Sequence, residues 1–476
     1  MKKIDWLIIT FLLLIALIFR LYKINIPLAD FHSWRQADTA AVARNFINNG
    51  FDLLHPQYDD LSNVQSGIDN PQGLRMVEFP LYNALFAYLF KLFPFFTLEV
   101  WGRLTTIFFS LIIIFIIYYL VLNEKNRLSA FFASFIYAVY PFFVFYSRVI
   151  LPETTALALA MLAIFFLYIS NNKKNLLQVL FSILSLIFFS LSLLIKPTTI
   201  FFIFPLFYLF LKRYQLKILF NPIFYLYFVL AVAPMVSWRL YIQNFPQAIP
   251  ANEWLITSIN TGNGLQKIFF KPAFFRWIFF ERINNLIFGG YLSVFFILGV
   301  FAKNKKYFLF SFLLSVLSYL FVFQGGNVQH DYYQTLILPT LAIFSGLGIN
   351  FVFENKKIIN QFLAIIITFF IISYSWFISY YLVKDHYHYS QELIQQANIL
   401  KSLTSPEDKI ITDRMGDTTL LYLSERRGAP AIYKDPKDLK NLGYKYLITS
   451  NKQEIENLKN TYKIIFENDK FVIFQL

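Results

Sequence analysis

Apolar runs long enough to cross a lipid bilayer recur along most of this chain. The stretches Trp6 to Leu21, Ile107 to Leu122 and Phe362 to Leu382 each contain at most one charged residue. A helix needs about 20 mainly apolar residues to cross about 30 Å of hydrocarbon, so each run predicts a membrane-spanning helix. On this criterion the sequence predicts about eleven spans. Their approximate ranges are 5–22, 100–122, 129–146, 152–170, 176–194, 198–212, 218–240, 283–302, 307–323, 332–353 and 358–382.

The composition favours the same class of protein. Of the 476 residues, 57% are hydrophobic and only 15% are charged, which is more apolar surface than one soluble core buries. The first run follows Met1-Lys2-Lys3, as in a signal peptide, but it is long and lacks a small-residue cleavage site. We therefore predict an α-helical polytopic membrane protein that keeps its first run as a transmembrane helix.

The basic residues indicate how the chain is oriented in the membrane. The net charge is +14, but Lys and Arg lie mostly in short connectors between the apolar runs, which argues against nucleic acid as a partner. Cytoplasmic connectors carry the excess of Lys and Arg, so we predict a multi-pass protein of the inner (plasma) membrane with its N-terminus in the cytoplasm and its C-terminus outside. The five basic connectors hold Lys125 and Arg127, Lys173 and Lys174, Lys212 and Arg213, Lys303 to Lys306, and Lys356 and Lys357.

In this orientation, the first loop and the C-terminal segment lie on the outer side of the membrane. Residues 1–385 are the predicted membrane domain, and its outer loop, residues 23–99, carries interfacial helices. Residues 386–476 are predicted to form a small soluble α/β extracytoplasmic domain, because a helical stretch precedes several short strand-like runs. The helix covers Ser390 to Leu403, and the runs are Lys409 to Thr412, Lys445 to Thr449 and Phe471 to Phe474.

The outer loop begins with a concentration of polar residues. Asp30 follows the first span, and Ser33 with Gln36 has the spacing of a capping box that starts a helix ending near Gly50. The helix has one broad apolar face and a polar face with Arg35 and Asp38, so we predict that it lies on the bilayer surface.

A second acidic residue of this loop lies before another apolar run. Glu78-Phe79-Pro80 precedes the run Leu81 to Phe93, and proline suits the first position of a helix. Acidic residues in such places often only hydrate helix ends. In a protein with so few charges, however, Asp30, Glu78, Arg35 and Trp34 in one loop also fit a polar site.

Two basic residues lie where the positive-inside tendency disfavours them. Arg148 is in one short outer turn and Lys196 is in another. A charge near the hydrocarbon is costly and needs a partner, and an anionic lipid phosphate is one such partner. The alternatives are that the side chains reach the outer headgroups, or that Arg148 pairs with Glu153. A third outer turn adds His330, Tyr332 and Tyr333.

Several other chemistries lack support in the sequence. It has no phosphate-cradling glycine loop, no HExxH zinc motif and no nucleophile motif, and it has no cysteine. We therefore expect no cofactor, while a pair of acids that binds a divalent metal remains open at this point.

The first loop and the later outer turns together resemble those of the protein O-mannosyltransferase superfamily, which includes bacterial aminoarabinose transferases and other family 39 glycosyltransferases. The matching segments are ADFHSWRQADTAAVARNF with Asp30, EFPLYNAL with Glu78, SRVILPE, IKPTT and HDYYQTLILP. Many members begin the loop with two adjacent acids, whereas Phe31 follows Asp30 here, which favours a divergent bacterial branch.

The resemblance implies a GT-C fold and a polyprenyl-phosphate sugar as donor. The sugar would pass, with inversion, to an extracytoplasmic hydroxyl of a lipid, glycan or protein. Asp30 fits the base that takes the acceptor's proton, with Glu78 in the same pocket. Lys196 and Arg148 fit the cations that stabilise the leaving lipid phosphate. Because these fixed charges could replace a metal ion, the resemblance implies no resident metal. The supporting pocket would comprise Trp34, Arg35, Asp38, Glu153, His330, Tyr332 and Tyr333.

Two other functions remain open at this point. A lipid-linked oligosaccharide ligase or polymerase shares many spans but uses a diphosphate carrier. A lipid or solute transporter would place charges at the bilayer midplane on paired broken helices, whereas here the charges lie at the outer ends of spans.

Overall fold

The computed structural model describes residues 1–250, 268–302 and 306–476, and the chain forms two compact units. The membrane unit comprises Met1–Ile24, Arg103–Arg239 and Leu255–His386. The loop unit comprises Asn25–Gly102, Leu240–Trp254 and Tyr387–Leu476.

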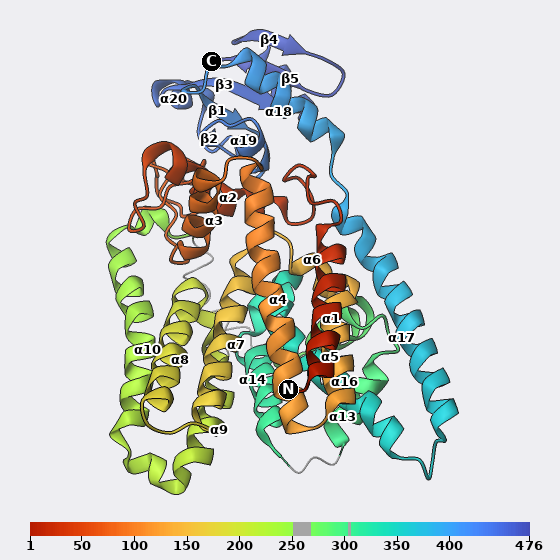
Figure 1. The fold of residues 1–476 in the computed structure, drawn as a ribbon. Helices are drawn as coiled ribbons and strands as arrows, with labels where there is room; N and C mark the ends of the chain where they lie inside the picture. Colours follow the sequence, from red (N-terminus) through yellow and green to blue (C-terminus); the bar gives the residue numbers. More distant parts are fainter. Residues whose placement is uncertain (251–267, 303–305) are drawn as a thin grey trace. The chain divides into compact units, whose positions relative to one another are not determined.

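Helices that lie roughly side by side build the membrane unit (Figure 1). They are α1 (Lys3–Leu21), α4 (Leu98–Glu124), α5 (Arg127–Val139), α6 (Pro141–Tyr146), α7 (Pro152–Ser170), α8 (Asn175–Ile195), α9 (Ile203–Tyr214), α10 (Pro222–Tyr241), α12 (Pro272–Phe275), α13 (Ser293–Phe301), α14 (Phe308–Val322), α15 (Gln324–Gln329), α16 (Leu338–Glu354) and α17 (Gln361–Val383). Shorter helical turns include η1 (Pro197–Phe202), η2 (Gln215–Phe220), η7 (Asp331–Ile337), η8 (Lys384–Tyr387) and the π-helix η6 (Arg276–Ile287).

The helices confirm a multi-pass membrane protein. In the three described ranges, seven helical segments are long and apolar enough to cross a bilayer, and every predicted span coincides with helix. Large apolar side chains such as Phe362 and Phe377 on α17 are exposed, as expected for a face that contacts lipid.

Two of the predicted spans are interrupted, which the sequence analysis did not foresee. The span at 129–146 divides at Pro141 into α5 and α6, because proline lacks an N–H and forces Tyr140 into an extended conformation. The span at 283–302 contains Gly289 and Gly290 in the left-handed region, between η6 and α13. Apolar run length alone did not reveal either break.

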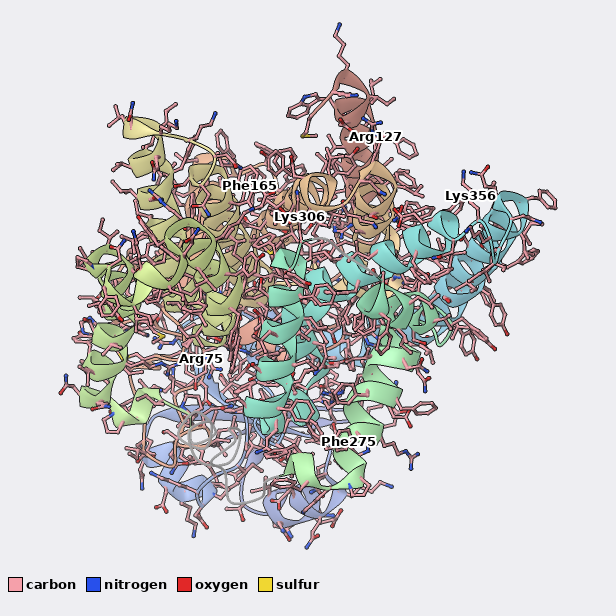
Figure 2. The ribbon with its side chains drawn as sticks, turned by 90° about the horizontal axis from the view of Figure 1, so that it is seen from below. Arg75, Arg127, Phe165, Phe275, Lys306 and Lys356 are labelled. Atoms are coloured by element: carbon pink, nitrogen blue, oxygen red, sulfur yellow. The ribbon has the colours of Figure 1, made fainter. Side chains whose placement is uncertain are left out.

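Three of the basic connectors lie at one end of the membrane unit. Lys125 after α4 forms an ion pair of 2.9 Å with Glu354 at the end of α16. Lys306, before α14, donates to the Asn123 carbonyl at 2.6 Å. Figure 2 views the protein from below and labels Arg127, Lys306 and Lys356, one from each connector. Lys303 and Lys305 fall outside the described residues.

The loop unit combines the first outer loop with a small mixed sheet, as Figure 1 shows in red and blue. Its helices are α2 (Ser33–Asn49), α3 (Leu81–Leu92), α18 (Gln391–Leu403), α19 (Thr419–Leu423), α20 (Pro436–Asn441) and α21 (Lys452–Leu458), with the turns η3 (Ile242–Asn244) and η4 (Pro246–Ala248). The strands are β1 (Lys409–Thr412), β2 (Gly428–Ala429), β3 (Tyr444–Thr449), β4 (Lys463–Glu467) and β5 (Val472–Gln475), in the order β2-β1-β3-β5-β4. The sheet confirms the predicted small α/β fold, although β2 and β4 were not predicted.

The prediction that the first loop helix lies on the bilayer surface is not supported. In α2 the supposed polar face is buried along with the apolar face, and Arg35, Asp38 and Asn45 are among its buried residues. The helix packs against α3 and α19. Its polar side chains therefore contact other protein groups. An amphipathic sequence pattern does not show whether a polar face meets protein or water.

Candidate active site

Asp30 is a buried carboxylate held by the helix that follows it. Its side chain is 2% exposed, and its Oδ1 accepts a hydrogen bond of 2.8 Å from Gln36 Nε2. The same amide nitrogen donates to the Phe31 carbonyl at 3.0 Å. The predicted capping box is therefore wrong. The N-cap is His32, in a left-handed conformation, and Gln36 fixes Asp30 in place instead of capping the helix.

Glu78 is held by the first turn of the same helix. Arg35 of α2 forms an ion pair with Glu78, and both side chains are largely buried. Glu78 lies shortly before α3, whose N-cap is Pro80. Arg35 and Gln36 are adjacent on α2, so one helical turn positions both acids that the sequence analysis proposed as catalytic. Trp34, which precedes them, is partly buried and accepts a long hydrogen bond of 3.4 Å at its carbonyl from Thr418.

Asp38 lies one turn farther along α2 and is bound by two distant parts of the loop unit. Arg75 Nη2 lies 2.9 Å from Asp38 Oδ2, and Thr418 of the C-terminal domain donates to Asp38 Oδ1 at 2.6 Å. Burial raises the pKa of Asp38, although Arg75 and Thr418 both favour its charged form. Asp38 therefore anchors the helix, and the sequence analysis missed its partners Arg75 and Thr418.

A second polar network joins α2 to the C-terminal domain. Arg44 donates to the Tyr422 carbonyl at 2.7 Å, and its guanidinium carbon lies 4.4 Å from the centre of the Tyr422 ring. Arg44 also pairs with Asp59, and the Tyr422 hydroxyl donates to Glu99 at 2.6 Å. The C-terminal domain therefore fastens the helix that carries Arg35 and Gln36.

In the membrane unit, Lys196 lies in a nearly buried pair with Glu153. Lys196 Nζ lies 2.7 Å from Glu153 Oε1, and the two side chains are 9% and 2% exposed. The same ammonium lies 5.3 Å from the centre of the Tyr333 ring. The structure thus brings together three residues proposed from separate outer turns. It also gives Glu153 a partner, Lys196, that the sequence analysis did not consider.

Arg148 is completely buried at the exit of α1. Its Nη2 donates to the Lys23 carbonyl at 2.9 Å, and Arg103 donates to the next carbonyl, that of Ile24, at 2.7 Å. Arg20, on α1 itself, donates to Ser147 Oγ at 2.7 Å. These arginines fix the end of the first span, from which the chain continues toward Asp30.

The third outer turn is an aromatic cluster held by an arginine. The His330 ring stacks on Tyr332 with the ring centres 5.1 Å apart, and Tyr332 contacts Tyr333 at 4.5 Å. Arg282 donates to the Val328 carbonyl at 2.6 Å and to Gln334 at 3.3 Å. The sequence analysis missed Arg282, because the partners that it holds lie 46 and 52 positions later in the chain.

The candidate residues thus form local groups within each unit. The loop unit holds Asp30 with Gln36, Glu78 with Arg35, and Asp38 with Arg75 and Thr418. The membrane unit holds Lys196 with Glu153 and Tyr333, and Arg148 with Lys23. Among the residues that the structure describes, no three His, Asp or Glu side chains are grouped to hold a metal ion.

The architecture is the GT-C fold of membrane glycosyltransferases. The structure of ArnT from Cupriavidus metallidurans bound to undecaprenyl phosphate covers 100% of this chain and 98% of its own, with 12% identity and a TM-score of 0.65. The Archaeoglobus fulgidus oligosaccharyltransferase complex with Zn and sulfate covers 94% of this chain and 68% of its own, with 13% identity and a TM-score of 0.62. The A. fulgidus AglB structure with an inhibitory peptide and a dolichol-phosphate covers 96% and 70%, with 12% identity and a TM-score of 0.59.

Within this class, residues 75–241 match the family model for dolichyl-phosphate-mannose-protein mannosyltransferase. The fold and this match confirm the resemblance to the GT-C glycosyltransferases of the protein O-mannosyltransferase superfamily. No curated protein sequence matches the chain.

Proposed function

We propose that this protein transfers one sugar from a polyprenyl-phosphate donor to an extracytoplasmic hydroxyl, with inversion at the anomeric carbon. The observation that carries the proposal is the buried Asp30 carboxylate, fixed by Gln36 beside the Arg35–Glu78 pair in a GT-C fold. Two of the similar structures support a lipid-phosphate partner, since ArnT is bound to undecaprenyl phosphate and AglB is in complex with a dolichol-phosphate.

In this reaction Asp30 acts as the general base. The acceptor oxygen forms a bond to the anomeric carbon while the bond from that carbon to the phosphate oxygen breaks. The hydroxyl proton passes to Asp30, and the electron pair of the broken bond stays on the polyprenyl phosphate. A base must first be placed within reach of the proton, which is what a buried and hydrogen-bonded carboxylate provides.

Lys196 and Arg148 supply the positive charge for the lipid phosphate. The Lys196 ammonium, 2.7 Å from Glu153 Oε1, can turn toward a phosphate when one binds. Fixed cations stabilise the charge that develops on a leaving monophosphate, so the proposal requires no metal ion.

The orientation that fits this chemistry has the N-terminus in the cytoplasm and the loop unit outside the inner (plasma) membrane. Its support is the shared end of the connectors with Lys125, Arg127 and Lys306, which the positive-inside rule assigns to the cytoplasm.

The test is turnover by purified protein in detergent with a defined polyprenyl-phosphate sugar. Asp30→Asn retains the shape and the acceptor for Gln36, so the protein should fold and bind donor while turnover falls by about two or more orders of magnitude. Asp52→Asn changes an exposed carboxylate in the same loop and serves as the control. Near-normal turnover by Asp30→Asn removes Asp30 as the base. Turnover only with a diphosphate-linked oligosaccharide identifies a ligase instead.

A further inference from the structure

The C-terminal sheet contains a point where the chain leaves two neighbouring parallel strands in opposite directions. Strands β1 and β3 are adjacent and parallel. From β1 the chain passes through α19 to β2 on one side, and from β3 it passes through α21 to β4 on the other side. The carboxyl ends of two such strands border a crevice, which is the common place for a ligand in open α/β sheets.

The structure has a cavity at this point. Its volume is about 220 Å³. Pockets that enclose drug-sized molecules are larger, at about 300–1,000 Å³. The residues after β1 and those after β3 form its two sides. It is lined by Gln396, Asp413, Arg414, Met415, Leu420, Ile448, Thr449, Ser450 and Asn451.

The polar groups of this crevice are held in place by one another. Thr449 Oγ1 donates to Asp413 Oδ2 at 2.8 Å, which links the two sides. Arg414 donates to the side-chain oxygen of Gln396 on α18. Asn451 Oδ1 accepts from the Gln453 N–H at 3.0 Å, which fixes the plane of its amide. Side chains that are ordered before a ligand arrives lose less entropy when it binds.

The backbone at the crevice is strained. Met415 has a φ of 49° and its side chain is 96% exposed, and Gly416 beside it has a φ of 95°. A left-handed conformation is unfavourable for a residue other than glycine, and such strain is concentrated at binding sites. Arg414 and Met415, at this left-handed turn, both line the crevice.

The chemistry of the lining indicates the class of ligand. The single lining carboxylate, Asp413, is balanced by the single lining cation, Arg414, so a strongly charged ligand has no net attraction. Planar carboxylate, amide and guanidinium groups can each bind a pair of neighbouring hydroxyls. Leu420 and Ile448 offer an apolar surface for C–H groups. These features match a sugar ring.

We propose that this crevice binds a neutral sugar ring and that the acceptor of the proposed transfer is therefore a glycan. The choice of a sugar rests on the proposed function, whereas the existence of the site rests on the sheet, the cavity and the strained turn. None of the residues proposed for transfer lines the crevice. The crevice would hold a glycan while another part of it reacts.

The test is saturation-transfer NMR on the full-length protein in detergent with methyl α-mannoside, methyl α-glucoside, methyl α-galactoside and N-acetylglucosamine at millimolar concentration. At least one sugar should receive saturation from the protein. Ser450→Trp, which fills the crevice from an exposed position, and Asn451→Ala should each reduce that signal at least tenfold. The control is Asn460→Ala, at an exposed site away from the crevice.

Two results overturn the proposal: no transfer to any of the four sugars, or transfer that both crevice variants leave unchanged. Asn451→Ala keeps the test decisive if Ser450→Trp misfolds. The measurement uses no lipid donor, so it is independent of turnover. A protein that binds sugar in the crevice but has no transfer activity would refute the proposed function and leave the crevice proposal standing. A protein that is active but binds no sugar in the crevice would refute the crevice proposal alone.

Discussion

Thr418 of the C-terminal domain donates a hydrogen bond of 2.6 Å to Oδ1 of Asp38, a residue 380 positions earlier in the chain. Close by, the hydroxyls of Thr419 and Ser33 are 3.0 Å apart. Asp38 lies on the helix whose first turn holds Asp30 and Glu78. The C-terminal domain is therefore part of the support of the candidate base.

Removal of the Thr418 hydroxyl should weaken this support. Thr418→Val has the same shape but leaves a buried carboxylate without one of its donors, so the loop unit should lose about 1–3 kcal/mol of stability. Turnover should fall because α2 is less firmly positioned, while Thr418→Ser should behave like the wild type. Thermal unfolding and turnover in detergent would measure both effects, with Thr461→Val at an exposed site as control. A normal melting temperature and turnover in Thr418→Val would show that Arg75 alone anchors Asp38.

Asp60 should make the stability of the loop unit depend on pH. Burial raises its pKa to about 6, against donors from Ser62 and Tyr58 that favour the charged form. The unfolded chain releases this proton near pH 4 and the folded protein only near pH 6, so the free energy of unfolding falls as the pH rises between these values. The fall should be about 3 kcal/mol, and it is complete above pH 6.

Asp60→Asn isolates this contribution. The amide oxygen still accepts from Ser62 but has no charge to bury. The variant should therefore melt higher than the wild type at pH 7.5, and the difference should shrink at pH 4.5. A difference in melting temperature that stays constant across this range would refute the assignment. Asp69→Asn, at a half-exposed carboxylate, is the matched control.

The donor-phosphate assignment predicts different outcomes for its two cations. Lys196→Gln should raise the Kd for polyprenyl phosphate at least tenfold, and adding Glu153→Gln should not restore affinity although it removes the unpaired acid. Arg148→Gln should raise the Kd and also lower the melting temperature, because it loses its bond to the Lys23 carbonyl. Titration of detergent-solubilised protein measures both. Lys125→Gln, in a basic connector, is the control, and unchanged affinity in both Lys196→Gln and Arg148→Gln would return these residues to a purely structural role.

Reporter fusions should test the orientation. An alkaline phosphatase joined after Leu476 should be active, and a fluorescent protein at the same place should be dark, because the C-terminus is predicted to lie outside. Fusions in the connector at Lys356 and Lys357 should give the opposite pattern. A bright fluorescent fusion after Leu476 would reverse the orientation and, with it, the whole site assignment.

The sequence predicted those features that depend on length and local pattern. Apolar run length located the spans because the bilayer thickness sets a fixed requirement. The break at Pro141 was missed because the residues on both sides of it are apolar. The proline itself is the only sign of the break in the sequence. Residues such as Asp30, Glu78 and Lys196 stood out because charges are rare beside membrane spans.

The partners of these residues were harder to predict. The spacing of Ser33 and Gln36 matches a capping box. The Gln36 side chain nevertheless donates to Asp30, because the same position on the helix brings both partners within hydrogen-bonding distance. The hydrogen bond from Thr418 to Asp38 joins residues 380 positions apart. No local sequence pattern shows which distant hydroxyl donates to a buried acid. Burial of α2 likewise depends on those distant segments.

The loop unit draws its residues from three stretches of the chain, the last of which is synthesised after α17. At about 5–20 residues per second, the ribosome finishes α2 well before Thr418 and Tyr422 emerge. Until then Asp38 and Arg44 lack their C-terminal partners. The support that the C-terminal domain gives to α2 is therefore complete only after the final segment has been synthesised and has folded. A chain that lacks this segment should insert its helices without a fully supported α2.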